Sequence, residues 1–369
     1  MKIKMIYIDD DNRDLKKYKR KFEENSESKD KFIIKTMNVQ HSLENIMAEI
    51  EKEKPELILV DFDLTKPKED FIIGMTGTML STVFREKFRD IPLVLFTRKS
   101  VFNAEKYFGL KEVLASIDEV AYKHDIFKAT GKNINFIYDL AVGYKKLRQS
   151  KLKNWSNLLR ILQAPVSDQE YLKRSDSPIF YKDKTTWSVP EIAKWIRYIL
   201  IKYPGILYDS IHAATYLGIS EKEFLRTELQ DFFEKAKYKG AFAQTECRWW
   251  KSQLSSVSKL IMDDNEIYMP LRKAFPVAWK RVKNASLEKS KCIFSDESPA
   301  EWICYILKKP VMIKYSLGYY PDSRPSVMDE ARVSFKAIKT SNDVNDELFD
   351  NIGKTMLKNI RNVKEKKRK

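Results

Sequence analysis

The spacing of hydrophobic residues in the first 150 positions alternates between a strand pattern and a helix pattern. Apolar, β-branched runs that predict strands cover residues 2–8, 31–37, 56–60, 91–96 and 115–122. Between and after these runs, apolar residues recur every three or four positions, which predicts helices at 12–24, 43–50, 77–88, 104–108 and 134–147. Strands that alternate with helices over short connections predict an α/β fold with a doubly wound, parallel, five-stranded sheet.

The pattern changes after about residue 150, where helical spacing dominates. Helices are predicted at 187–201, 223–237, 248–262 and 300–308, with the best strand candidate at 311–315. Ser188 and Ser298 each precede a Glu by three residues, with Pro in the first turn, which is typical of a capped helix start. We therefore expect an α/β domain at 1–148, a linker at 149–169, a mainly helical domain at 170–353 and a basic tail at 354–369.

Composition refines this picture through its charge. The 369 residues are 43% hydrophobic, which excludes disorder for most of the chain. Lys and Arg outnumber Asp and Glu by 68 to 52, a net charge of +16. Only +3 of it falls in residues 1–150, which hold 28 basic and 25 acidic residues. The basic character therefore belongs to the second region and favours anionic partners.

Several classes of protein are excluded by what the sequence lacks. Three cysteines and three histidines, widely spaced, do not predict a disulfide framework, a C-x-x-C metal site or histidine-cluster chemistry. No glycine-rich phosphate loop is found. No apolar run approaches the ~18 residues of a membrane span, and no signal peptide pattern opens the chain. We expect a reduced, cytoplasmic protein without membrane contact.

The residues that follow the predicted strands carry most of the candidate chemistry. The carboxyl ends of parallel strands meet at one edge of the sheet. This edge would gather acidic, hydroxyl and ammonium groups from Asp9, Asp10, Asp61, Asp63, Thr97 and Lys123. Clustered carboxylates repel one another, so they need a hard cation, and Mg²⁺ with oxygen ligands suits them. A carboxylate beside that ion can attack a phosphoryl group, while the hydroxyl and the ammonium hold its oxygens.

Four motifs in this order resemble the response-regulator receiver domain of two-component signalling. They are Ile6-Tyr7-Ile8-Asp9-Asp10-Asp11, Leu57-Ile58-Leu59-Val60-Asp61, Leu95-Phe96-Thr97 and Tyr122-Lys123. The resemblance covers about residues 1–148 and implies a flavodoxin-like fold.

The resemblance also assigns roles to the edge residues. It implies that Asp61 is phosphorylated, and that Asp9, Asp10 and Asp61 hold Mg²⁺ together with the backbone carbonyl of Asp63. Thr97 and Lys123 would contact the phosphoryl group. The implied donor is a histidine kinase or a phosphotransfer protein. Beyond self-phosphorylation and slow dephosphorylation, no enzymatic activity is expected. The alternative is a degenerate receiver that serves only as a docking module.

Three features depart from the family pattern. The stretch after Asp61, up to Gly74, is longer than usual. His124 follows Lys123 where the family usually has Pro, and Val120 stands where an aromatic switch residue is usual. The expected consequence is an altered coupling between phosphorylation and the surface of the domain.

The second region leaves two outputs open. In the first, it is a helical protein-interaction or relay module. In the second, a helix-turn-helix-like element near 209–230, with a turn at Gly218 and a cap at Ser220, reads DNA. The acidic start of its second helix argues against base reading, so we expect only weak, non-specific nucleic-acid binding. The pair Trp249-Trp250 predicts either core packing or a base-stacking platform.

Overall fold

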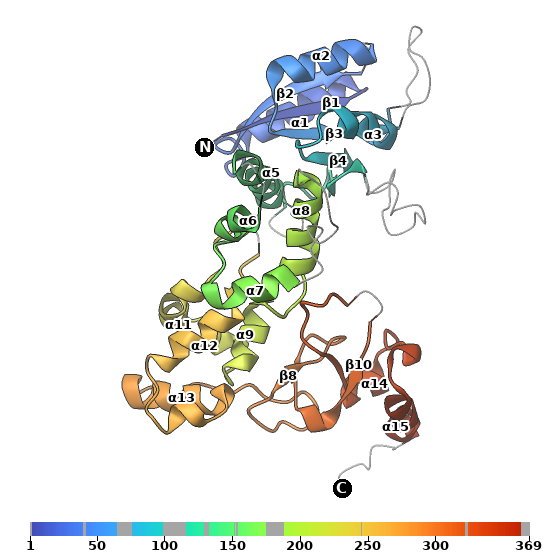
Figure 1. Ribbon diagram of the computed structural model, residues 1–369. Coiled ribbons are helices and arrows are strands. Elements are labelled where there is room, and N and C mark those ends of the chain that lie inside the picture. The colour runs from blue at the N-terminus through green and yellow to red at the C-terminus, as the bar shows by residue number, and fades with distance from the viewer. Residues whose placement is uncertain are drawn as a thin grey trace. The chain divides into compact units, whose positions relative to one another are not determined.

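The computed structural model describes two compact units of the chain (Figure 1). The described residues are 2–39, 42–64, 76–98, 116–128, 133–150, 152, 154–174, 188–244, 246–321 and 324–362. Within them, the first unit comprises residues up to 162 together with 188–196 and 240–244, and the second unit comprises the rest. No helix among the described residues is long and apolar enough to cross a membrane.

The first unit is built on a five-stranded sheet whose strands all run parallel. The strand order is β2-β1-β3-β4-β5. The bounds are β1 (Ile3–Asp9), β2 (Phe32–Asn38), β3 (Leu57–Val60), β4 (Leu93–Thr97) and β5 (Glu119–Tyr122). This topology confirms the predicted flavodoxin-like fold class, and it brings the carboxyl ends of β1 and β3 side by side at the middle of the sheet.

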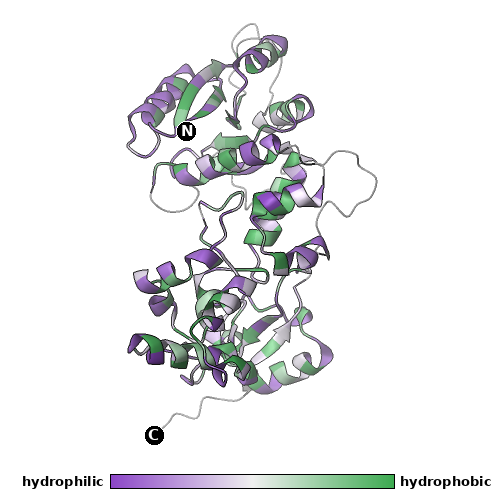
Figure 2. Ribbon diagram, turned by 60° about the vertical axis from the view of Figure 1, so that its left-hand side comes forward, coloured by the Kyte–Doolittle hydropathy of each residue, from purple (hydrophilic) through white to green (hydrophobic). Residues whose placement is uncertain are grey.

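Helices cover both faces of the sheet because successive strand residues point to opposite sides. The helices are α1 (Asn12–Glu24), α2 (Leu43–Glu53), α3 (Gly77–Lys87) and α5 (Ile134–Gln149). On one face, Ile6 and Ile8 pack in a buried cluster with side chains of α2 and α3. On the other, Tyr7, Tyr18 and Phe96 meet edge to face. Figure 2 shows the apolar strands between helices whose outer faces are polar.

Two further helices belong to the first unit: α6 (Trp155–Leu162) and α8 (Val189–Trp195). Ser188 stands at the N-cap position of α8 with Pro in the first turn, as its sequence predicts, but its side chain makes no capping hydrogen bond to the helix. The helix predicted around 104–108 lies outside the described residues.

The second unit begins with a helical part that packs around one apolar core. Its α-helices are α7 (Val166–Arg174), α9 (Ser210–Tyr216), α10 (Glu221–Phe224), α11 (Thr227–Phe232), α12 (Lys251–Lys259) and α13 (Leu271–Lys283). Shorter helical turns are η2 (Ile196–Ile201), η3 (Glu234–Ala236) and η4 (Glu266–Tyr268). The continuous helix predicted over 223–237 is therefore wrong: Arg226 is extended and starts α11 anew.

Trp249 and Trp250 form the short strand β7 (Trp249–Trp250), which pairs with β6 (Leu207–Tyr208). Their side chains are only 1% and 2% exposed. Both rings belong to the interior of the second unit, so the base-stacking interpretation of this pair is wrong and the core interpretation is confirmed.

The last third of the chain forms small two-stranded sheets and short helices around a second core. The elements are β8 (Trp302–Ile303), β9 (Pro310–Val311), η5 (Ile313–Tyr315), β10 (Ser316–Tyr319), β11 (Ala331–Ser334), α14 (Phe335–Thr340), η6 (Asp346–Leu348) and α15 (Asn351–Asn362). α15 lies at the start of the predicted basic tail, and residues 363–369 lie outside the described residues.

The helix predicted at 300–308 is wrong. Trp302 and Ile303 pair with β9 instead. Glu301, which the sequence pattern assigns to a helix cap, accepts a hydrogen bond from the Ile313 backbone at 3.0 Å and pairs with Arg272 at 2.8 Å. The predicted strand at 311–315 is displaced in the same way, because residues 313–315 form the turn η5 and the strand follows it. Tertiary partners overrode the local pattern here.

The helix-turn-helix-like element forms a tight, buried hairpin between α9 and α10. Gly218 has a φ of +76°, and a Cβ at this position would lie 1.9 Å from the Arg272 carbonyl oxygen, so only glycine fits. Ser220 caps α10 by accepting from the Glu223 N–H at 3.3 Å. α10 has only four residues, about 6 Å of helix. So short a helix supports the structural interpretation of the element rather than a reading head.

Candidate functional site

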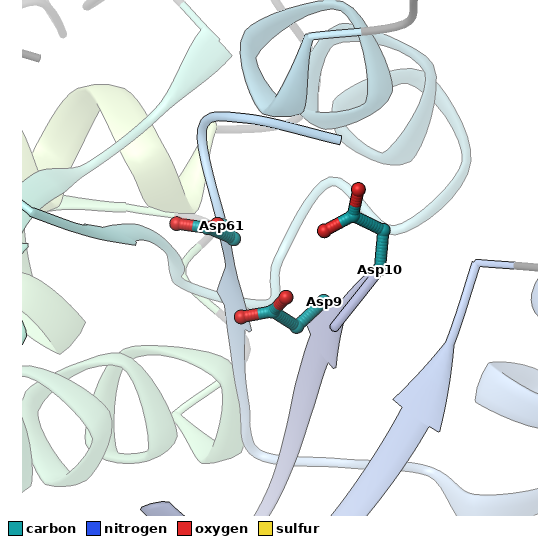
Figure 3. Close-up of side chains that lie close together, drawn as sticks. All are labelled: Asp9, Asp10 and Asp61. Carbon is teal, nitrogen blue, oxygen red and sulfur yellow. The ribbon is translucent and has the colours of Figure 1, made fainter. Parts of the chain in front are cut away.

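Three carboxylates converge at the carboxyl edge of the sheet (Figure 3). Asp9 ends β1, Asp10 follows it, and Asp61 follows β3. One carboxylate oxygen from each of the three lies within 4.8 Å of the others. The backbone N–H of Asp61 donates to the Ile8 carbonyl at 2.9 Å, which ties the two strand ends together. The parallel pairing of β1 and β3 therefore creates the cluster that the sequence predicts.

Lys123 places an ammonium group among these carboxylates. Its backbone N–H donates to the Thr97 carbonyl at 2.8 Å, so it continues the pairing of β5 with β4. Its Nζ lies 2.8 Å from Asp9, 3.2 Å from Asp14 and 3.2 Å from Asp61. The side chain is 2% exposed. One buried cation thus contacts carboxylates from both central strand ends and from α1.

Burial and repulsion set the protonation of the site. Burial raises the pKa of Asp61 to about 7, and the nearby Asp9 adds to the shift while Lys123 opposes it. Burial also disfavours the charged form of Lys123, but the attraction of Asp61 and Asp9 outweighs it and raises the pKa of Lys123. The site therefore holds a charged lysine beside a carboxylate that takes up a proton near neutral pH when no cation is bound.

Three side chains in the site were missed by the sequence analysis: Tyr7, Asp14 and Arg98. The Tyr7 hydroxyl donates to Asp9, and burial, with Asp9 adding to it, raises the pKa of Tyr7, so the phenol stays protonated. Tyr7 and Asp9 are two residues apart in β1, so their side chains point to the same face of the sheet. The sequence pattern of the strand therefore contained this information.

Asp14 and Arg98 form a second ion pair beside Lys123. Arg98 directly follows Thr97, and its Nη2 lies 2.8 Å from Asp14. Burial opposes the charge on Asp14, but Arg98 and Lys123 hold the pKa of Asp14 below its usual value. In the sequence, Asp14 stands three residues after the helix cap Asp11, which suggests an ordinary capping pair. Only the tertiary structure reveals its contact with Lys123.

The charge and donor set of the site fit a divalent cation. Four carboxylates, Asp9, Asp10, Asp14 and Asp61, stand against two cations, Lys123 and Arg98. When all six groups are ionised, two negative charges remain. The clustered ligand atoms of Asp9, Asp10 and Asp61 are all oxygens, the ligands that Mg²⁺ prefers. The residues present therefore fit the magnesium ion that the sequence analysis predicts.

Thr97 offers an unused hydroxyl at the end of β4. The residue is 1% exposed, and its Oγ1 has no hydrogen-bond partner in the described part of the chain. A buried hydroxyl without a partner is costly. An oxygen of a bound group would satisfy it, which is the role that the sequence analysis assigns to Thr97.

The loop after Asp61 closes onto the start of α3. Asp63 forms an isolated bridge with Thr76, and the Gly77 N–H donates to the Phe62 carbonyl at 2.8 Å. A Cβ on Gly77 would lie 1.8 Å from the Asp61 carbonyl oxygen, so only glycine allows this approach. The N-terminus of an 11-residue helix thus begins beside Asp61, where its dipole favours negative charge.

Two of the departures from the family pattern can be placed, and the first of them, His124, is exposed. Val120 is buried with Leu95 and Ile117, and Tyr122 packs partly buried against this cluster. Tyr122 pairs in register with Thr97. Residues 65–75, which form most of the long stretch after Asp61, lie outside the described residues.

Comparisons with known proteins find similar solved structures for the N-terminal part of the chain. No family model matches the chain, and no curated protein matches it. Among solved structures, a receiver domain protein from Clostridium thermocellum is 15% identical and covers 40% of this chain and 98% of its own, with a TM-score of 0.28. A Francisella receiver domain is 19% identical and covers 37% and 96%, with a TM-score of 0.27.

A third structure is a response regulator from Thermotoga maritima in complex with Mg²⁺-BeF. It is 18% identical and covers 35% of this chain and 91% of its own, with a TM-score of 0.25. Identities this low concern the fold alone, and each match spans well under half of the chain. The N-terminal region of this protein is similar in structure to response-regulator receiver domains.

Proposed function

We propose that the first unit is an active receiver whose Asp61 accepts a phosphoryl group from a histidine kinase or a phosphotransfer protein. The observation that carries this proposal is the contact of buried Lys123 with Asp9 and Asp61 at 2.8 Å and 3.2 Å. A degenerate docking module has no need to bury a lysine among three carboxylates, because desolvating such charges is costly.

Asp9, Asp10 and Asp61 would hold Mg²⁺, with the backbone carbonyl of Asp63 as a further ligand. When bound, the ion neutralises charge on the phosphoryl oxygens. Asp61, in its ionised form, attacks the phosphorus of a phosphohistidine. The new bond joins a carboxylate oxygen to phosphorus, the P–N bond breaks, and the leaving imidazole nitrogen takes up a proton. The products are an aspartyl phosphate and a free histidine.

Lys123 and Thr97 hold the transferred group. Phosphorylation neutralises the carboxylate of Asp61 and adds a dianionic group next to it. Lys123 then binds a phosphoryl oxygen in place of the Asp61 carboxylate, and the unpartnered Thr97 hydroxyl donates to another. Both contacts are stronger in the phosphorylated form than before it, which stabilises the product.

The test is phosphorylation by a small donor. The full chain, incubated with acetyl phosphate and Mg²⁺, should gain one phosphoryl group that base and hydroxylamine remove. Asp61→Asn should abolish it. Asp125→Asn, at an aspartate outside the carboxylate cluster that pairs with Lys128, is the matched control and should leave it intact. An intact, folded protein that gains no phosphoryl group would support the degenerate alternative.

For the second unit we propose an output role as a protein-interaction or relay module. Support comes from α10, whose four residues are too short for a recognition helix, and from the burial of Trp249 and Trp250, which cannot stack on bases. Retention of the chain by a cognate kinase, with only salt-sensitive binding to random DNA, would support the module. Selection of one duplex sequence at physiological salt would contradict it.

A further inference from the structure

A cavity of about 780 Å³ lies within the second unit. It is lined by residues of the helical part and of the sheet-rich part, and bonds join the two: the Asp329 N–H donates to the Pro204 carbonyl at 2.9 Å, and Arg272 pairs with Glu301 at 2.8 Å. Its volume falls within the range of ~300–1,000 Å³ that small-molecule sites occupy. The cavity therefore has the size of a ligand site between two packed cores.

Aromatic side chains contribute much of the lining. They are Tyr203, Tyr208, Tyr216, Trp302 and Tyr305. The rings of Tyr208 and Tyr216 lie 5.6 Å apart. Such flat, apolar surfaces suit the face of a planar ring.

The acidic side chains of the lining are already occupied. Each is bound to a basic residue: Asp209 to His212 at 2.7 Å, Asp329 to Lys251 at 2.9 Å, Glu301 to Arg272 at 2.8 Å and Glu330 to Arg332 at 2.6 Å. A cationic ligand would have to displace one of these partners. The cavity is therefore poorly suited to cations.

Two exposed lysines of the lining, Lys202 and Lys308, form no ion pair among the described residues. Burial lowers the pKa of Lys308, and the nearby Asp209 opposes this shift. Their Nζ atoms lie over aromatic rings instead, 5.6 Å from the centre of Tyr203 and 4.3 Å from that of Tyr305. Both rings line the cavity. The charges of the lining that have no ion-pair partner are thus positive. They lie beside the aromatic side chains of the lining, which we call the aromatic wall.

Two polar groups remain for a ligand to bind. The Asp209 carboxylate accepts from Nδ1 of His212, which in the neutral ring leaves Nε2 as an acceptor. Thr215, one turn further along α9, is 2% exposed, and its Oγ1 has no hydrogen-bond partner within the described residues. A ligand with its own donor and acceptor would satisfy both groups.

We propose that this cavity binds a nucleotide. The base stacks on the aromatic wall, its polar edge bonds with Thr215 and His212, and the phosphates bind Lys202 and Lys308. This site needs no glycine-rich loop, because side-chain ammonium groups supply the phosphate contacts. All of its residues belong to the second unit, so the proposal stands independently of the phosphorylation of Asp61.

The test uses the full chain and the fluorescent nucleotide N-methylanthraniloyl-ATP at physiological salt. The probe should bind saturably and be displaced by ATP, and tripolyphosphate, which lacks a base, should displace it far less well. Lys308→Gln and Thr215→Val should each weaken binding by about tenfold, which corresponds to about 1.4 kcal/mol. Lys259→Gln, at an exposed lysine outside the cavity, should leave binding unchanged.

Three results would overturn the proposal. The first is a folded protein that shows no saturable binding of the probe. The second is displacement by tripolyphosphate as effective as that by ATP, since the aromatic wall would then contribute nothing. The third is unchanged affinity in both Lys308→Gln and Thr215→Val. Both variants should fold like the wild type, because Lys308 is exposed and Val has nearly the shape of Thr.

Discussion

Replacing Lys123 by Met tests how the carboxylate cluster is held together. The substitution keeps the length of the side chain but removes the ammonium that contacts Asp9, Asp14 and Asp61 at 2.8, 3.2 and 3.2 Å. Removing one partner of a buried ion pair costs about 3–5 kcal/mol. We expect a loss of that size in the first unit at pH 8 with EDTA present, where the carboxylates of the wild type are mostly charged and no cation replaces the lysine.

The loss should shrink on acidification. The pKa of Asp61 is raised to about 7 in the folded state, so folding favours its protonated form. The resulting contribution to the free energy of unfolding is fully present below the pKa of the unfolded state. It is lost as the pH rises through about 7. From pH 8 to pH 6 the wild type regains about 1.4 kcal/mol. Without Lys123 the pKa of Asp61 is higher still, and the variant regains up to about 2.7 kcal/mol over the same interval. The difference between the two proteins should therefore fall by up to about 1.3 kcal/mol.

Hydrogen exchange of amides in β1 and β3, measured on the full chain, reports these opening free energies. The matched control is Lys128→Met, which removes an exposed pair with Asp125 at 2.7 Å and should cost no more than about 1 kcal/mol at either pH. A loss below about 1 kcal/mol for Lys123→Met at pH 8 would refute the reasoning. So would a loss that does not change between pH 8 and pH 6.

Three further predictions concern the metal, the loop after Asp61 and the basic tail. Because Mg²⁺ binds only the folded cluster, millimolar Mg²⁺ should raise the melting temperature of the first unit, and Asp10→Asn should reduce that rise; equal shifts in both proteins would exclude Asp10 as a ligand. Gly77→Ala should destabilise β3 by at least about 1–3 kcal/mol in hydrogen exchange, since its Cβ would lie 1.8 Å from a backbone oxygen, and a neutral result would show that the loop moves away freely. Deleting 364–369 should remove most binding to random DNA in a salt titration while leaving phosphorylation intact, and undiminished binding would place the DNA contacts elsewhere.

The strand ends of the sheet were predictable because the hydrophobic runs are unambiguous. A run such as Leu57–Val60 is buried on both faces and ends in an acid, so period and length together locate Asp61. The same logic located Asp9, Thr97 and Lys123. Parallel strands end at the same edge of a sheet, so the residues that follow neighbouring strands meet there without further information from the sequence.

The missed residues owe their roles to contacts between distant elements. Asp14 and Arg98 are 84 positions apart and meet only because α1 packs over β4. Likewise, the helix predicted at 300–308 fails because Glu301 binds Arg272 and Ile313, far from any cap. Local patterns carry no information about such partners, so the second unit, with its short elements, was predicted less well than the first.

The central claim, that Asp61 accepts the phosphoryl group, is tested most directly by locating the modified residue. Borohydride reduces an aspartyl phosphate to homoserine, which peptide mass spectrometry assigns to one position. After treatment of the full chain with acetyl phosphate and Mg²⁺, the account predicts homoserine at position 61, with none at positions 9 and 10. Reduction at position 9 or 10, or a phosphoryl group on a serine, threonine or histidine that borohydride leaves in place, would contradict it.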